Sequence, residues 1–199
     1  MKNKPKKQTA FVLIHSNIRP FLHYDSPKHD RSAVCRTFIV SNRKDNTKGF
    51  IGGTVDEGES IIDGLVREID EEYSFDLDRD KLSLLSTNED DRMVSHLFDY
   101  EVDEVTFFEI LHTVNKNFTE FFQKNIAFLK EHHKDKNIEN LSREKFGVSH
   151  YFCETRSIEA IYITDRKYDM ENLFKTNFIG FGKEEVKLFL DKYQINYEG

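Results

Sequence analysis

The segment from Gly52 to Tyr73 constrains the fold of this chain more than any other stretch. Gly52 and Gly53 interrupt regular structure, and the apolar residues that follow recur three and four positions apart. This spacing predicts an amphipathic helix from Glu59 to Tyr73. Because glycine permits backbone conformations and close approaches that a Cβ resists, we expect the preceding loop to be pressed against this helix.

The predicted helix carries charged and apolar residues on neighbouring faces. With about 100° between successive residues, Glu68, Glu71 and Glu72 project into one sector, while the apolar stripe is centred roughly 130° away. That stripe consists of Ile62, Leu65, Val66 and Ile69. Gly64 lies one turn before Glu68 on the acidic side, where we expect it to leave room for a bound cluster. One face therefore packs, and the next presents oxygen ligands.

The three carboxylates repel one another, at a cost of a few tenths of a kcal/mol per pair unless something neutralises them. Hard cations such as Mg²⁺ and Mn²⁺ prefer carboxylate oxygen and commonly bridge to substrate phosphate. A solvated acidic face is the ordinary alternative, but it does not account for Gly53 and Glu59 upstream. Glu59 is eight residues before Arg67, and we expect the two to pair and to organise the loop rather than to react.

The spacing of these residues resembles the Nudix box: Gly, five residues, Glu, seven residues, Arg-Glu, an aliphatic residue, any residue, Glu-Glu, any residue, Gly and an aliphatic residue. Two positions depart from this pattern. Ser74 replaces the last Gly, and Ile51 stands where many members have Pro. Ser74 is expected at the helix C-terminus, where Gly is favoured for left-handed backbone, so its presence affects local geometry and leaves the acidic residues intact.

The resemblance implies a fold, a cofactor and residue roles. The fold is α/β, an α/β/α sandwich around a mixed sheet, and the cofactor is Mg²⁺ or Mn²⁺. The implied metal ligands are Glu68, Glu71, Glu72 and Gly52. The implied catalytic set is Glu71, Glu72, Arg67 and Glu59, with one of the box glutamates or a downstream acid deprotonating water. Cations lower the pKa of water that they bind and neutralise charge on the attacking and leaving oxygens at phosphorus, which suits hydrolysis of a nucleoside diphosphate linked to a group X.

The rest of the chain predicts strands mixed with helices. Strands are expected at Thr9–Ser16, Arg36–Val40, Leu82–Thr87, Val94–Val102 and Ile158–Thr164, with a further candidate at Arg19–Tyr24. One or two helices are expected from about Val105 to Lys136 and a terminal helix at Glu184–Tyr193. We interpret residues 1–199 as a single domain with a helical insertion at about 116–150, because that insertion is short for an independent core.

Three short segments, the first of which overlaps the box, resemble one branch of the family, the snoRNA-decapping and inosine diphosphatase branch. They are Asp63–Glu68, Val94–Phe98 and Asn177–Gly180. This branch hydrolyses purine nucleoside diphosphates such as inosine diphosphate and removes caps from RNA. An Arg upstream of its box loop contacts substrate, and Arg43 stands at the matching place, although an exposed turn residue is an equal alternative. We find no convincing equivalent of the branch's base-contacting His, since neither His15 nor His23 aligns.

The sequence also contains candidate residues for substrate binding and for an extra metal ligand or base. The proposed substrate-binding residues are Arg43, Gly53, His96 and Phe178, because base recognition combines stacking with edge hydrogen bonds. For His96 and Phe178 a purely structural role is the commoner alternative. Glu154 and Glu159 are candidates for an extra ligand or base, against the commoner role of surface carboxylates. His132 and His133 lack a third partner, and we do not assign them to a metal.

The composition limits the class of protein. A formal net charge of −7 argues against broad binding of nucleic-acid backbone, but it leaves room for a nucleotide or a capped RNA 5′ end. No apolar run is long enough to cross a bilayer, and two distant cysteines fit a reducing compartment, so we expect a cytoplasmic or nuclear protein without a membrane anchor. The Lys-rich start is expected to be a solvated tail, with a phosphate-touching arm as the alternative.

Several alternatives stay open at this point. Another Nudix substrate, such as a dinucleoside polyphosphate, NAD, ADP-ribose or a damaged nucleoside triphosphate, is one of them, because the box contacts the diphosphate and not the group X. A non-catalytic RNA-binding or scaffold protein on the same fold is another, although the intact glutamates weigh against it. A homodimer is a further option.

Overall fold

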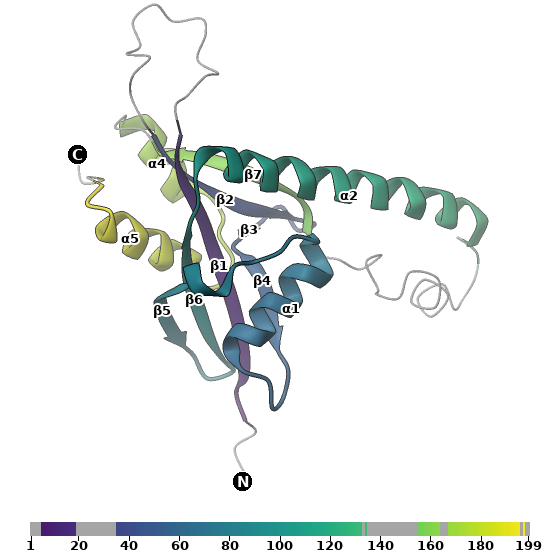
Figure 1. Cartoon of the computed structure of the whole chain (residues 1–199), viewed down its shortest axis with the longest axis horizontal. Helices are drawn as coiled ribbons and strands as arrows, with labels where there is room; N and C mark the ends of the chain where they lie inside the picture. Colours follow the sequence, from purple (N-terminus) through teal and green to yellow (C-terminus); the bar gives the residue numbers. More distant parts are fainter. Residues whose placement is uncertain are drawn as a thin grey trace, which may run out of the picture.

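The centre of the molecule is a seven-stranded sheet (Figure 1). The computed structural model describes residues 5–18, 35–132, 134, 155–163, 167–195 and 197. The strands are β1 (Lys7–Ile18), β2 (Cys35–Arg43), β3 (Lys48–Gly49), β4 (Ile51–Val55), β5 (Ser83–Glu89), β6 (Met93–Glu101) and β7 (Thr155–Ile163). They run in the order β3-β2-β1-β6-β5, with β4 also paired to β1 and β7 also paired to β2.

Strand directions make the sheet mixed. β1 pairs with β6 in parallel, whereas the β1–β2, β1–β4, β2–β3, β2–β7 and β5–β6 pairs are antiparallel. β1 is long enough to pair with β4 through its first half and with β2 through its second half. The central strand β1 therefore joins β4, which contains Gly52 and Gly53, to the rest of the sheet.

Helices cover both faces of this sheet, as the predicted α/β/α sandwich requires (Figure 1). They are α1 (Ile61–Tyr73), α2 (Glu104–His132), α4 (Lys167–Lys175) and α5 (Gly182–Lys192), with a short 3-10 turn, η1 (Arg79–Lys81). One apolar core joins α1 and α2 to alternate residues of β1, such as Ala10 and Val12. A second core joins α4 and α5 to the opposite face, through residues such as Leu13 and Phe38.

The region around Gly52 and Gly53 is a strand, so the predicted break in regular structure there is wrong. Gly52 pairs with Phe11 across the β1–β4 ladder at a φ of 141°, which residues with a side chain rarely adopt. A Cβ at Gly52 would also overlap the backbone carbonyl of Ala10. The glycines thus serve a close approach within a strand, where sequence patterns read them as loop formers.

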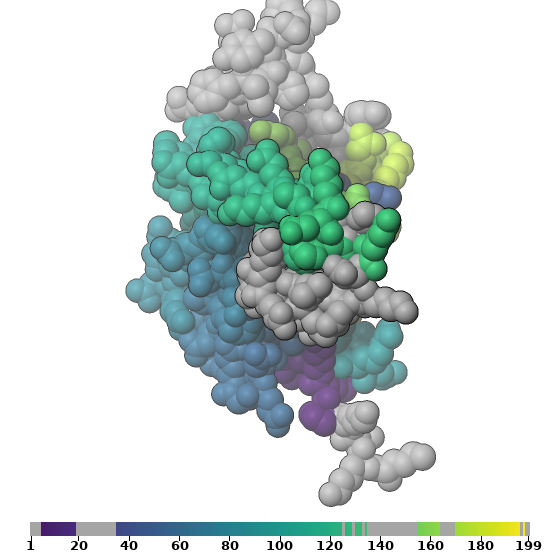
Figure 2. Space-filling model, turned by 90° about the vertical axis from the view of Figure 1, so that its right-hand side faces the viewer, coloured from purple at the N-terminus to yellow at the C-terminus, as the bar shows by residue number. Residues whose placement is uncertain are grey.

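The segment after β6 forms one continuous helix, α2, rather than two. Its first half belongs to the core, because Phe107, Ile110, Val114 and Phe118 are buried against the sheet. Figure 2 looks along this helix and shows its residues above those of α1. The single-domain assignment and the insertion at about 116–150 stay predictions, and most of residues 133–154 lie outside the described chain.

The other predicted elements agree with the structure within a few residues at each end. The terminal helix and the five predicted strands are present. The candidate strand at Arg19–Tyr24 lies outside the described residues. The helix α4 was not predicted, although Met170, Leu173 and Phe174 stand at helical spacing, because nine residues are too few to establish a period.

Candidate functional site

The helix α1 begins and ends at serine residues that fix its position. Ser60 is the N-cap, and its side chain accepts a hydrogen bond from the backbone N–H of Asp63. Ser74 is the C-cap and has left-handed backbone, with φ 54° and ψ 50°. The left-handed C-terminus predicted for the Gly position of the box is therefore present, although the residue is Ser.

The strand β4 lies directly against α1. A Cβ at Gly53 would overlap Glu68 Oε2, so only glycine lets the carboxylate of Glu68 lie on the strand. The expectation that Gly64 leaves room for a bound cluster is wrong. A Cβ there would come within 2.9 Å of Val55 Cγ2 and 3.0 Å of Glu59 Oε2, because the loop itself fills that space.

Arg67 holds the loop and the helix together. Its guanidinium donates to Glu59 through Nε and Nη2, both at 3.1 Å, and to the backbone carbonyl of Thr54 at 2.9 Å. The predicted pairing of Glu59 with Arg67 is thus present. Hydrogen bonding to Glu59 raises the pKa of Arg67, and the same contact lowers the pKa of Glu59. Both side chains are therefore held in their charged forms.

Arg67 also engages two of the acidic ligand candidates. Its Nη1 donates to Glu68 Oε1 at 2.9 Å and to Glu71 Oε2 at 3.1 Å. Glu68 is 15% exposed and Glu71 is 45% exposed, so Glu71 lies further toward solvent. In this arrangement Arg67 partly neutralises the acidic face that the sequence pattern left without a counter-ion.

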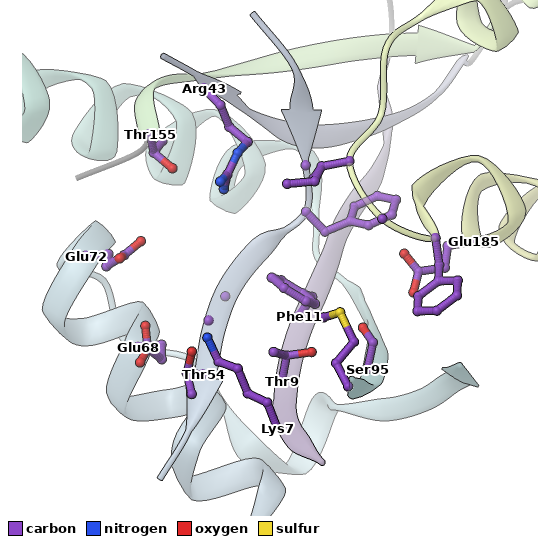
Figure 3. A pocket seen from close by; sticks show the side chains of 18 of the residues that line it. Lys7, Thr9, Phe11, Arg43, Thr54, Glu68, Glu72, Ser95, Thr155 and Glu185 are labelled. Carbon is purple, nitrogen blue, oxygen red and sulfur yellow. The ribbon is translucent and has the colours of Figure 1, made fainter. Parts of the chain in front are cut away.

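A cavity of about 550 Å³ opens beside Glu68 and Glu72 (Figure 3). Residues from six strands (β1, β2, β3, β4, β6 and β7), from the helices α1 and α5 and from the segment before α5 line it. They are Lys7, Thr9, Phe11, Arg43, Gly49, Phe50, Gly52, Gly53, Thr54, Glu68, Glu72, Tyr73, Met93, Ser95, Thr155, Ile179, Gly180, Phe181 and Glu185. A volume of this size suits a small-molecule ligand such as a nucleotide.

Glu72 is the most perturbed acid of this end of the cavity. Burial raises its pKa to about 7, and the nearby charge of Glu68 adds to this rise, while Arg43 opposes it. Figure 3 shows Arg43 and Glu72 on either side of the cavity mouth, with Thr155 between them. Two carboxylates and one guanidinium therefore face a common space, which is a suitable arrangement for phosphate and a cation together.

The three box glutamates do not converge on one point. Glu68 and Glu72 line the cavity, whereas Glu71 is turned toward Arg67 and is not among the lining residues. Within the described residues no group of three His, Cys, Asp or Glu side chains is preformed to hold a metal ion. The raised pKa of Glu72 nevertheless fits a divalent cation, because a cation would relieve the repulsion that Glu68 exerts on a buried carboxylate.

The sequence-predicted substrate residues divide into two groups. Arg43 and Gly53 line the cavity, whereas His96 and Phe178 are not among its lining residues. Gly52, which was predicted as a metal ligand, lines the cavity as well. The side chain of His96 contacts Gln8 and Thr87. Phe178 is buried in the core around α5 and stacks on Phe50 with ring centroids 6.2 Å apart.

The remaining candidates lie apart from the cavity or outside the described chain. Glu159 is held by Lys48 and by Asn42, whose Nδ2 donates to Oε2 at 3.0 Å. His132 contacts Glu131 and Phe128 on α2. His15 is fully buried between β6 and α5. Glu154, His133 and His23 lie outside the described residues.

Other cavity residues were missed by sequence reasoning. Lys7, the last residue of the Lys-rich start, begins β1 and lines the cavity, whereas residues 1–4 lie outside the described residues. Glu185, in the first turn of α5, lines the end opposite Glu68 (Figure 3). Burial raises the pKa of Glu185 to about 7, although a hydrogen bond from Asn88 acts to lower that pKa. The only sequence signal was an acid at a position that helical spacing places on the apolar side of a terminal helix.

Comparison with known families agrees with this site. The family described as NUDIX domain matches residues 28–137, which include α1, the loop before it, the strands β2 to β6 and the helix α2. The chain belongs to the Nudix family. The prediction of a Nudix pyrophosphohydrolase is thereby confirmed at the level of the family, and a divalent metal and a nucleotide substrate are general features of that family. A comparison with curated proteins gave no match.

One solved structure shares this fold at low sequence identity, and two others are similar at a lower TM-score. A MutT/nudix family protein from Listeria innocua is 12% identical with a TM-score of 0.50, and the alignment covers 96% of each chain. The E. coli ORF135 protein is 10% identical with a TM-score of 0.41 over 98% of this chain and 96% of that one. A MutT/nudix family protein from Enterococcus faecalis is 16% identical with a TM-score of 0.41 over 52% of this chain, which spans only 39% of its length.

Among the described residues, none of the helices combines the length and the apolar character needed to cross a bilayer.

Proposed function

We propose that this Nudix protein hydrolyses the phosphoanhydride of a nucleoside diphosphate linked to a further group X. The observation that supports this is the cavity in which Glu68, Glu72 and Arg43 meet at one end. Carboxylates are suited to a divalent cation, and a guanidinium is suited to the phosphate oxygens that the cation would leave uncompensated. The remaining length of the cavity then accommodates the nucleoside.

The chain's own residues divide the work. Arg67 positions the site by holding Glu59 and the carbonyl of Thr54, and through them the strand β4. Arg43 lies across the cavity from Glu72 and is proposed to hold a substrate phosphate. Gly52 and Gly53 let the backbone of β4 come close to the reacting groups, where Gly52 is proposed to offer its carbonyl as a ligand.

Glu68 and Glu72 would hold the divalent cation, Mg²⁺ or Mn²⁺, and Glu71 would join them by turning away from Arg67. When bound, such a cation supplies Lewis-acid stabilisation of phosphate charge and favours deprotonation of water. The box glutamates are the acids available to accept that proton. Release of Glu71 leaves Arg67 still bound to Glu59 and Glu68, so the loop keeps its position.

The finer substrate is proposed from the resemblance to the decapping and inosine diphosphatase branch. Purine nucleoside diphosphates, with inosine diphosphate first, and the capped 5′ end of RNA are the substrates to test. Arg43, which that resemblance singled out, lines the cavity, and this supports the proposal. We further propose one catalytic domain over residues 1–199, working in the cytoplasm or the nucleus.

A substrate panel tests this proposal directly. The full chain would be incubated with Mg²⁺ or Mn²⁺ and with inosine diphosphate, capped RNA, NAD, ADP-ribose and diadenosine polyphosphates, and kcat/KM would be compared. We expect the first two to exceed the others by at least about tenfold, which corresponds to about 1.4 kcal/mol of transition-state discrimination. Equal and feeble rates on all five would contradict the branch assignment.

A variant separates enzyme from scaffold. Glu72→Gln keeps the shape of the side chain and removes its charge, and we expect a loss of roughly 10²–10⁴ in kcat. Asp70→Asn is the matched control, since this substitution removes the same charge from an exposed position of the same helix. If both variants turned over substrate as the unmodified chain does, the proposed site would be wrong.

A further inference from the structure

We propose that Glu185 is the specificity-determining residue of a base subsite at the far end of the cavity, and that it selects a guanine-type base. This inference rests on the proposed function, because it assumes that the diphosphate lies at the Glu68 end. Figure 3 shows Glu185 across the cavity from Glu68 and Glu72, with its carboxylate directed into the cavity and Phe11 between the two ends.

Glu185 is an unusual side chain for its position. It is 4% exposed, although it belongs to the first turn of α5, where neighbouring Glu184 is exposed. An acid at a helix N-terminus interacts favourably with the helix dipole, but Glu184 gains that without burial. Burying a carboxylate is costly unless it is paired, so the inward placement of Glu185 needs a partner.

The described residues satisfy only part of this carboxylate. Asn88 Nδ2 donates to Glu185 Oε1 at 3.2 Å, and within the described part of the chain no donor reaches Oε2. Each carboxylate oxygen has two lone pairs, so one acceptor site on Oε1 and both on Oε2 are left for further donors. A ligand that offers N–H groups in the cavity would meet that capacity.

A polar row lies across the sheet beside Glu185. Thr9 of β1 pairs in register with Ser95 of β6, and Ser95 pairs with Asn88 of β5. Thr9 and Ser95 are buried and line the cavity. Two positions further along β1, on the same face, is Phe11, and Phe181 lines the cavity from the segment before α5. Hydroxyls and flat apolar rings in one small space suit a purine base.

The chemistry of the base edges decides among purines. Guanine presents an imide N1–H and a 2-amino group side by side, and both donate to a carboxylate. Hypoxanthine retains only the N1–H. Adenine presents a ring nitrogen acceptor beside its amino group, and that acceptor would face the carboxylate oxygens without a proton between them. Glu185 therefore favours guanine over hypoxanthine and adenine, unlike the inosine preference that the branch resemblance implies.

The test measures binding of reaction products, so that no hydrolysis is needed. Guanosine, inosine and adenosine 5′-monophosphates would be titrated into the full chain by calorimetry, in the presence of Mg²⁺. We expect inosine and adenosine monophosphates to bind about ten- to a hundredfold more weakly than guanosine monophosphate, the usual effect of losing a hydrogen bond to a charged group. Equal affinity for all three would overturn the proposal.

Two variants sharpen the result. Glu185→Gln keeps the shape but replaces one acceptor with a donor, and it should remove most of the preference for guanine. Glu184→Gln makes the same charge change one residue away on the exposed side of α5 and should leave the preference intact. An unchanged preference in Glu185→Gln would overturn the proposal, and so would its loss in both variants.

The outcome is distinguishable from failure of the proposed function. If Glu185 does not read the base, hydrolysis of the substrate panel can still proceed and still depend on Glu72. If the chain does not hydrolyse diphosphates, the monophosphate titrations still report whether the cavity prefers guanine. Should Glu185→Gln not fold, the comparison of the three monophosphates on the unmodified chain remains decisive.

Discussion

Ser74 ends α1 in a backbone conformation that L-residues other than glycine adopt at a cost. Its φ of 54° and ψ of 50° are left-handed, and its N–H bonds to the carbonyls of Ile69 and Asp70. Left-handed backbone costs about 1–2 kcal/mol for a residue with a Cβ. We therefore expect Ser74→Gly to raise the free energy of unfolding by about 1 kcal/mol, measured by urea denaturation. Ser74→Ala should give no such gain, and a gain from Ala as large as that from Gly would contradict this explanation.

Gly53 is a second residue at which a single atom matters. Because a Cβ there would overlap Glu68 Oε2, we expect Gly53→Ala to displace that carboxylate and to lower kcat/KM by about a hundredfold, the scale of a misplaced catalytic group. Gly58→Ala is the control, since no atom lies within 4 Å of its Cβ position and only its φ of 87° is strained. The control should lose stability and keep activity. Full activity of Gly53→Ala would show that Glu68 is not needed where it lies.

At the scale of residues, spacing predicted partnerships within the box better than contacts beyond it. The pairing of Glu59 with Arg67 follows from two positions on one helix and its loop, and the structure contains it. Glu185 is separated from its partner Asn88 by 97 positions, and a local pattern cannot bring them together. Gly64 shows the reverse error, because the space expected beside it is filled by Val55 from a different element.

At the scale of elements, α5 is attached to the sheet by a buried polar network. Tyr193 and Lys192 each approach Asp99 Oδ2 at 2.8 Å, and His15 Nε2 lies 2.9 Å from Oδ1. Burial alone would raise the pKa of Asp99, but hydrogen bonds from His15, Lys192 and Tyr193 outweigh it and lower the pKa to about 2. The network thus connects β1, β6 and the helix that carries Glu185.

This network predicts how stability changes in acid. A carboxyl whose pKa is depressed on folding stabilises the protein above its unfolded pKa of about 3.9, and this contribution is lost as the pH falls toward 2. We expect about 2 kcal/mol to disappear in that window. Asp99→Asn should lose this amount at neutral pH and show a flatter dependence between pH 4 and 2, measured by denaturant unfolding at each pH. Asp191→Asn, an exposed acid of α5, is the control, and an equal effect there would contradict the assignment.

Helices and strands could be predicted where their apolar residues recur regularly and where their conformation does not depend on a pairing partner. The helix α1 and the strands β1 and β6 fall in this group. The strand β4 was missed because its sequence, IGGTV, is strand-like only through its pairing with β1, which a local pattern does not contain. The spacing of apolar residues also did not show whether α2 is one continuous helix, since a run of aromatic residues fits one helix or two.

At the scale of the whole molecule, the site and the stability of the fold are coupled through charge. Glu68 and Glu72 raise the free energy of the metal-free state, because a buried carboxylate is held beside a like charge. A cation that binds the folded chain and not the unfolded one stabilises it by RT ln(1 + [L]/Kd). Metal binding should therefore be visible in thermal unfolding without any substrate.

We expect Mn²⁺ at about a hundred times its Kd to add roughly 2.7 kcal/mol, which for a chain of this size raises Tm by about 5–10 °C. The chelator EDTA should reverse the shift. The double variant Glu68→Gln, Glu72→Gln should lose the response, because it removes both carboxylates at the α1 end of the cavity, whereas Asp70→Asn should retain it. The measurement is differential scanning calorimetry at several Mn²⁺ concentrations. A shift of equal size in the double variant would place the cation elsewhere on the molecule and would leave the acidic face of α1 without the role proposed for it.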